Sequence, residues 1–243
     1  MNIHERTRLL IGDQGIQRLR ESSVAVYGLG GVGGYAFEAL VRAGVGKLYV
    51  VDCDIVEPSN LNRQILATQE TIGRKKVDVA MERAKAICPD IIIVPVYERI
   101  LPENVHQLVP NDITYAIEAI DSLGAKVSLI AENYRRGNIF VSCMGAARRL
   151  NPEMVRAADI SETFGCPLAK RVRTALRKQG IVRGVRCVFS AEPPVVQYQQ
   201  PNETTGDNAL VKRPQGSLSY IPGMLGLFAA GLILSEILKG ALH

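Results

Sequence analysis

Short runs of β-branched and aliphatic residues alternate with helix-compatible segments over the first 145 residues. The apolar runs predict strands at 23–27, 47–52, 91–96, 113–119 and 139–143. The segments between them predict helices over about 32–43, 71–88, 102–109 and 122–136. This alternation predicts the α/β class, with a doubly wound, Rossmann-like and mostly parallel sheet. In such a sheet, ligands bind at the carboxyl ends of the strands.

The ends of the chain have a different pattern. Residues 4–21 predict two short helical pieces broken at Gly12 and Gly15. After the alternating part, the pattern predicts a short segment at 154–160, a cationic helix at 167–179, a strand at 184–190 and a polar, mobile loop at about 198–216.

The last stretch, 217–239, is apolar and rich in Gly and Ala. Pro222 and Glu236 leave a window shorter than the about 20 apolar residues that a membrane span needs, so we expect a buried core helix. The 243 residues predict one domain with two halves, 1–150 and 151–243, of which the second is expected to pack on the first as a C-terminal extension.

A glycine-rich turn joins the first predicted strand to the first helix. Gly28, Gly30 and Gly33 match Gly-x-Gly-x-x-Gly, in which the glycines allow a tight turn, close approach of a pyrophosphate and helix–strand packing. Free amides at the helix N-terminus then attract negative charge. Asp52 ends the second strand, where a carboxylate can accept both ribose hydroxyls. The motif predicts a bound nucleotide and leaves NAD, FAD and ATP open. We therefore expect 1–150 to be the nucleotide-binding half and 151–243 to be the substrate-binding half.

Charged side chains at the same predicted edge favour ATP. A dehydrogenase usually needs a positioned acid or base, but all three histidines lie away from this edge. Arg63 and Lys76 can instead stabilise charge on phosphate oxygens, and Asp121 can hold the Mg²⁺ that a triphosphate requires. A non-catalytic NAD-binding regulator would give these three residues no reason to occur together.

These motifs resemble the ubiquitin-activating-enzyme-like superfamily of adenylyltransferases, in Gly-x-Gly-Gly-x-Gly, in Asn60-Leu-x-Arg-Gln64, in a later lysine and in a metal-binding aspartate. The resemblance implies that Arg63 and Lys76 contact the triphosphate, that Asp121 holds Mg²⁺, and that Arg8 reaches into the partner's site across a homodimer. The nucleotide-binding residues it implies are Gly28, Gly30, Gly31, Gly33, Asp52, Asp54, Asn60 and Gln64.

The second half more closely resembles the tRNA threonylcarbamoyladenosine dehydratases. The similar stretches are Ile120-Asp121-Ser122, Asp159-Ile, Pro167-Leu-Ala-Lys170, Cys187-Val-Phe-Ser-Ala-Glu192 and the final Gly/Ala-rich helix. The resemblance implies an enzyme that uses ATP and Mg²⁺ to adenylate the threonyl carboxylate of the modified adenosine beside a tRNA anticodon. A nitrogen of the same side chain then closes a ring, and AMP is released.

An alternative is an adenylyltransferase that activates a ubiquitin-like sulfur-carrier protein. Such activators often hold zinc in two Cys-x-x-Cys pairs, and this sequence has neither, so we expect no zinc. The activator would also need a functional thiol. Cys166 lies in a Gly-Cys-Pro loop where a thioester cysteine could lie, but a cyclising dehydration needs no thioester. Cys187 opens an apolar strand and is expected to be core.

The cationic helix fits a tRNA substrate. Seven cations and no acid lie between Lys170 and Arg186, although the whole chain has a net charge of only +5. We expect tRNA backbone contacts from Lys170, Arg171, Arg173, Arg177 and Lys178.

Dispersed cysteines and a charged N-terminus predict a reducing, cytoplasmic environment. The sequence leaves open whether a cysteine desulfurase or a sulfur acceptor is a partner, and whether a monovalent cation supports the fold.

Overall fold

A computed structural model describes residues 3–196 and 215–241. The strands that it contains are β1 (Ser23–Tyr27), β2 (Lys47–Val51), β3 (Ile92–Val96), β4 (Tyr115–Glu118), β5 (Ile139–Cys143), β6 (Val155–Asp159) and β7 (Arg186–Ser190). Within the described residues they form a seven-stranded sheet in the order β3-β2-β1-β4-β5-β7-β6. All of its pairings are parallel except that of β6 with β7. The predicted doubly wound, mostly parallel sheet is confirmed.

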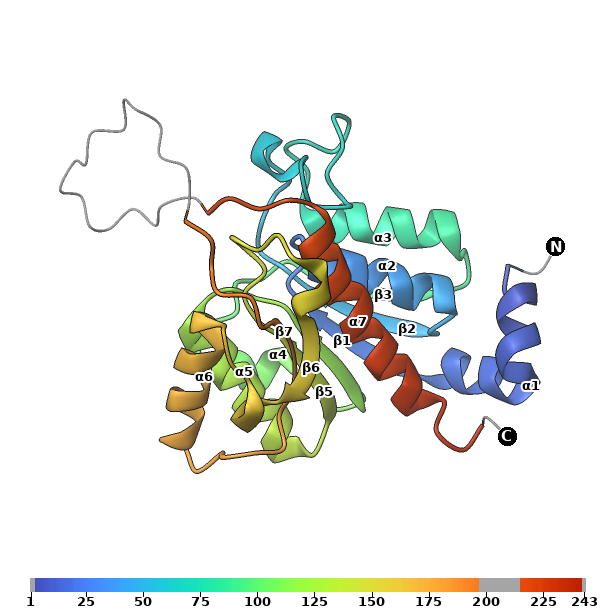
Figure 1. Ribbon diagram of the computed structural model, residues 1–243. Helices are drawn as coiled ribbons and strands as arrows, with labels where there is room; N and C mark the ends of the chain where they lie inside the picture. Colours follow the sequence, from blue (N-terminus) through green and yellow to red (C-terminus); the bar gives the residue numbers. More distant parts are fainter. Residues whose placement is uncertain (1–2, 197–214, 242–243) are drawn as a thin grey trace.

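Helices cover both faces of this sheet (Figure 1). Their bounds are α1 (Glu5–Glu21), α2 (Gly33–Ala43), α3 (Lys76–Ile87), α4 (Val105–Leu108), α5 (Leu123–Arg136), α6 (Pro167–Arg177) and α7 (Tyr220–Ile237). Single 3-10 turns occur at Pro58–Asn60, Pro152–Met154 and Ile160–Glu162. The predicted short segment at 154–160 is the antiparallel edge strand β6.

The two faces have separate hydrophobic cores, and β1 contributes to both. Val24 and Val26 pack in one core with α2, α3 and α7, whereas Ala25 and Tyr27 pack in the other with α4, α5 and α6. All four side chains are fully buried. Alternate residues of a strand point to opposite faces, so a strand covered on both faces has an uninterrupted apolar sequence.

The apolar C-terminal stretch forms α7, which packs against α2 and closes one face of the sheet (Figure 1). A Cβ atom at Gly226 would lie only 2.2 Å from the Val32 carbonyl oxygen, so glycine permits this close approach. Among the described residues, α7 is the one helix long and apolar enough to cross a membrane, but half of it is buried inside the protein. One side of α7 therefore packs in the core, as the sequence predicted, whereas Met224, Leu227 and Phe228 on the other side are exposed.

The N-terminal helix departs from the prediction at one of its two glycines. The chain breaks at Gly12, where φ is 67° and ψ is −178°. Gly15 instead lies inside the helix and is buried. A Cβ atom at this position would lie only 2.7 Å from Cβ of Ile11, so a larger residue would not fit. The predicted break at Gly15 is wrong, because this glycine provides room for a side chain and does not bend the backbone.

The predicted mobile loop at 198–216 lies outside the described residues, apart from 215 and 216.

Candidate nucleotide-binding and adenylation site

The glycine turn connects the carboxyl end of β1 to α2. Gly28 adopts φ of 87° and donates its amide hydrogen to the Val51 carbonyl oxygen at 2.8 Å. A Cβ atom at Gly33 would lie 1.8 Å from the Gly28 carbonyl oxygen, so the helix could not begin so close to the strand with any other residue. At Gly30 a Cβ atom would meet nothing within 4 Å, so the backbone faces open space there. This geometry leaves room for a phosphate group.

Asp52 holds the turn in place from the end of the neighbouring strand. Its two carboxylate oxygens accept hydrogen bonds from the amides of Leu29, at 2.5 Å, and Asp54, at 2.8 Å. The side chain is buried, and burial raises the pKa of Asp52 while the charge of Lys76 opposes that shift. Asp52 therefore orders the glycine turn in addition to any contact with a ribose.

Lys76 and Asp54 form an ion pair beside Asp52. The ammonium Nζ of Lys76 lies 2.9 Å from Oδ2 of Asp54, and Lys76 is only 4% exposed. Burial raises the pKa of Asp54, but its hydrogen bond to Lys76 and the charge of that lysine outweigh burial, so the pKa lies below its usual value. The ammonium group of Lys76 is thus held close to Asp52 and the glycine turn, where it can attract phosphate oxygens.

The loop that contains Asn60 and Gln64 holds the Arg63 side chain next to the glycine turn. Asn60 is buried and accepts the amide hydrogen of Glu57 through its side chain at 3.1 Å, while its carbonyl oxygen accepts that of Gln64 at 2.9 Å. The Arg63 side chain lies against the glycine turn, because a Cβ atom at Gly31 would be 3.4 Å from its Cγ. Its guanidinium donates to the Ser59 carbonyl oxygen at 2.8 Å.

Asp121 follows β4 at the same edge of the sheet and is exposed. The loop before it touches the glycine turn, since a Cβ atom at Gly28 would lie 3.0 Å from both the Ala119 carbonyl oxygen and Cγ2 of Ile120. The described residues contain no group of three or more His, Cys, Asp or Glu side chains that could hold a metal ion. A single exposed carboxylate fits Mg²⁺ that takes its remaining ligands from phosphates and water.

A fully buried ion pair, which we did not anticipate from the sequence, supports this loop. Oε2 of Glu118 lies 2.6 Å from Nζ of Lys126 and accepts the Ser142 hydroxyl at 2.6 Å. Oε1 of Glu118 accepts the amide hydrogen of Ile120 at 2.9 Å, and Lys126 donates to the Cys143 carbonyl oxygen at 2.8 Å. The pair therefore ties both sides of Asp121 to the ends of β4 and β5. A charged residue ending an apolar strand was the signal that could have revealed it.

Arg8 is separated from the other candidate residues within one chain. It lies in α1, where its Nε is 2.9 Å from Oδ1 of the exposed Asp13. The end of α1 leads into the start of β1, so the helix lies at the opposite edge of the sheet from the glycine turn (Figure 1). An action of Arg8 across a homodimer stays a prediction.

The cationic helix α6 presents one charged stripe, which we name the basic stripe. Its cations are exposed and form two neighbouring pairs that are seven residues, or about two helical turns, apart: Lys170 with Arg171, and Arg177 with Lys178. Arg173 differs, because its Nη1 donates to the carbonyl oxygen of Thr163 at 2.8 Å and to Oγ1 of the same residue at 2.6 Å. Arg173 therefore has a structural role that the sequence did not reveal.

The two candidate thiols are buried. Cys187 lies in β7, where burial raises its pKa, so the thiol is kept protonated in the core. Cys166 is 4% exposed and directly precedes α6. Neither thiol is presented to solvent as a nucleophile.

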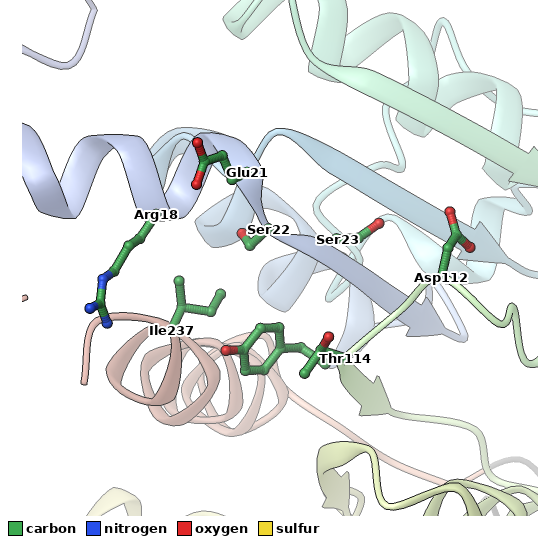
Figure 2. A pocket seen from close by; sticks show the side chains of 8 residues that line it. Arg18, Glu21, Ser22, Ser23, Asp112, Thr114 and Ile237 are labelled. Carbon is green, nitrogen blue, oxygen red and sulfur yellow. The ribbon is translucent and has the colours of Figure 1, made fainter. Parts of the chain in front are cut away.

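A cavity of about 330 Å³ lies at the other edge of the sheet (Figure 2). There Arg18 of α1 donates to the carbonyl oxygens of Lys239 and Gly240 beyond α7. The lining residues are Arg18, Glu21, Ser22, Ser23, Asp112, Thr114, Tyr115 and Ile237. None of them is a candidate site residue. The cavity lies where the end of α1 contacts the end of α7 and the residues after it.

Comparison with known proteins gives a consistent result along the whole chain. The model of the ThiF family matches residues 4–242. The tRNA threonylcarbamoyladenosine dehydratase of Bacillus subtilis (strain 168) is 38% identical over 238 residues, which cover 96% of this chain and 94% of that protein. The crystal structure of E. coli tRNA N6-threonylcarbamoyladenosine dehydratase with AMP has a TM-score of 0.86 and 31% identity, covering 97% of this chain and 94% of that one.

The structure of the same E. coli enzyme with ATP also has a TM-score of 0.86 at 31% identity, covering 97% of this chain and 93% of that one. The similarity therefore extends over both residues 1–150, which contain the glycine turn, and the later residues that contain α6 and α7.

Proposed function

Because the chain belongs to the ThiF family, we propose that it is an ATP-dependent tRNA threonylcarbamoyladenosine dehydratase. It would adenylate the carboxylate of N6-threonylcarbamoyladenosine next to the anticodon and cyclise the side chain with release of AMP. One observation carries the proposal. The glycine turn, Arg63, Lys76 and Asp121 meet at one sheet edge, in a fold that matches an ATP-bound dehydratase over 97% of the chain.

The site geometry supports an adenylation. Amides of the glycine turn, Lys76 and Arg63 would bind the triphosphate, and Asp121 would hold Mg²⁺, which offsets negative charge on the phosphates. The substrate carboxylate attacks the α-phosphorus of ATP, a new O–P bond forms, and pyrophosphate leaves. A side-chain nitrogen of the modified nucleoside then attacks the acyl carbon and loses its proton as AMP leaves. The net change in the nucleoside is the loss of one water molecule.

Further parts of the proposal concern the surroundings of the site. We place the enzyme in the cytoplasm as a homodimer in which Arg8 contacts the partner's nucleotide, and we assign the basic stripe to the tRNA backbone. The stripe begins at Lys170 in α6, and the start of this helix contacts the chain after β5, next to β4 and Asp121. Arg173 contributes by supporting the stripe, since its guanidinium binds the loop before α6.

Activation of a sulfur-carrier protein is the alternative function. It needs an accessible thiol for sulfur or acyl transfer, and the candidates Cys166 and Cys187 are buried. The similarity to dehydratases also covers the C-terminal half. We therefore favour the dehydratase.

Release of AMP tests the proposal. With ATP and Mg²⁺, tRNA that carries threonylcarbamoyladenosine should stimulate AMP release, and tRNA without this modification should not. Asp121→Ala should abolish the reaction with the fold intact, because it removes the proposed ligand of Mg²⁺. Arg63→Ala should slow the reaction by about 10²-fold, because it removes a cation that stabilises charge on the phosphates. Stimulation by a sulfur-carrier protein in place of tRNA would support the alternative.

A further inference from the structure

An exposed aromatic side chain lies just before the basic stripe. Phe164 is 58% exposed, although the other member of its ring pair, Phe189 of β7, is buried. The two ring centroids are 5.9 Å apart and the planes meet at 77°, so the rings pack edge to face. Phe164 is thus anchored by one contact while much of its ring remains open to solvent.

The loop that holds Phe164 is rigidly supported on both sides. Gly165 adopts φ of 70°, and a Cβ atom there would lie 2.0 Å from the Ala191 carbonyl oxygen, so this backbone packs directly on the chain after β7. On the other side, Arg173 binds the carbonyl and hydroxyl oxygens of Thr163. A side chain on such a loop is preorganised, and a ligand need not order it on binding.

Phe164 also lies on the side of the molecule that carries the candidate site. Cys166 touches the chain after β5, since a Cβ atom at Gly145 would be 3.7 Å from its Sγ. Both contacts of the loop are thus at the carboxyl ends of β5 and β7, and β5 pairs with β4, which leads to Asp121. Helix α6 begins near the carboxyl ends of β5 and β7, and the basic stripe follows the helix from there. Phe164 precedes the first turn of α6, so it lies at the end of the stripe that is nearer to Asp121.

We propose that Phe164 is a stacking platform for an unpaired base of the RNA substrate, close to the nucleotide that is modified. The proposal rests on the proposed function and adds a base contact to the phosphate contacts of the basic stripe. Proteins recognise single-stranded RNA through unstacked bases on aromatic side chains, with nearby cations on the backbone. Phe164, which precedes α6 by three residues, offers an exposed aromatic face, and Lys170 and Arg171 within α6 offer the cations.

Steady-state kinetics with substrate tRNA would measure the contribution of the ring. Phe164→Ala and Phe164→Leu should each raise the KM for tRNA by about tenfold, because one base–aromatic stack is lost. Leucine keeps an apolar contact with Phe189 but has no aromatic face, whereas Phe164→Tyr should behave as the parent does. Val182→Ala is the matched control, since Val182 is also half exposed but follows the far end of α6. The KM for ATP should be unchanged in all four variants.

Fluorescence gives a direct readout, because the chain contains no tryptophan. The Phe164→Trp variant should lose emission when an anticodon stem-loop RNA is added, and Val182→Trp should not. Unchanged tRNA KM in the alanine and leucine variants, or no quenching, would overturn the proposal while the parent still releases AMP with tRNA. Absence of tRNA-dependent AMP release from the parent is a separate outcome, and it would refute the proposed function together with this inference.

Discussion

The buried pair of Glu118 and Lys126 links individual residues to the site. Both side chains are fully buried, and removing one partner leaves an uncompensated charge in the interior. Lys126→Met should therefore lower the free energy of unfolding by about 3–5 kcal/mol, measured by urea denaturation. Glu118→Gln combined with Lys126→Met should recover part of this loss, because the amide oxygen can still accept the Ile120 amide hydrogen. Equal stability of the parent and the single variant would show that the pair is not needed.

His4 gives a pH-dependent contribution to stability. Burial, and then the charge of Arg20, lower the pKa of this histidine in the folded state. The unfolded chain therefore binds the proton more readily, so stability is fully present above about pH 6.5 and decreases as the pH falls from there through the folded pKa. The melting temperature of the parent should fall below pH 6.5 more steeply than that of His4→Phe. Parallel melting curves in this pH range would contradict the assignment.

At the level of elements, local sequence predicted the strands and most helices because each has a strong apolar pattern. The strands at the centre of the sheet are buried on both faces, so their runs are uninterrupted, and Gly28, Gly30 and Gly33 occupy a turn that few other residues allow. Contacts that depend on how side chains pack in three dimensions could not be predicted in this way. The role of Arg173 depends on a loop ten residues away, and that of Gly15 depends on how a side chain packs.

The candidate site also contains residues that the sequence could predict and residues that it could not. The residues that follow strands, Asp52 and Asp121, were predictable because parallel strands end at one edge. The pairing of Lys76 with Asp54, the pair of Glu118 with Lys126, and the exposed ring of Phe164 required three-dimensional information.

Helix α7 provides a test with an internal control. Gly226→Ala would place a Cβ atom 2.2 Å from a backbone oxygen of Val32, so we expect a loss of about 1–3 kcal/mol in unfolding free energy from overpacking. At Gly231 a Cβ atom would meet nothing within 4 Å, so Gly231→Ala should stabilise by about 0.8–1.0 kcal/mol through helix propensity. Denaturation in urea measures both. Equal effects of the two substitutions would contradict the close packing of α7 on α2.

In helix α6, different cations are expected to bind tRNA and to support the structure. Arg177→Glu with Lys178→Glu should weaken tRNA binding and reduce its salt dependence, because fewer phosphate counterions are released, while the KM for ATP stays the same. Arg173→Glu should in addition lower the melting temperature, since its guanidinium binds the loop at Thr163. Filter binding over a salt series and thermal unfolding separate the two effects. An unchanged salt slope in the double variant would make the stripe a solvated surface only.

At the level of the whole molecule, the proposed role of Arg8 at the nucleotide site would need a second chain. Within one chain α1 lies at the sheet edge opposite the glycine turn, so Arg8 is far from the proposed nucleotide site of its own chain. We propose that it acts in the site of a partner. Arg8→Ala and Asp121→Ala proteins should each be inactive. A mixture that exchanges subunits should regain activity, because each heterodimer contains one intact site. Proven exchange without activity would contradict the arrangement.

The central claim is that the enzyme removes water from threonylcarbamoyladenosine in tRNA at the expense of ATP. Mass spectrometry of nucleosides from tRNA incubated with the protein, ATP and Mg²⁺ tests it most directly. We expect the threonylcarbamoyladenosine signal to be replaced by a species lighter by one water, with one AMP formed per nucleoside converted. The Asp121→Ala protein should leave the nucleoside unchanged. An unaltered nucleoside after incubation with the parent protein, despite bound ATP, would contradict the account.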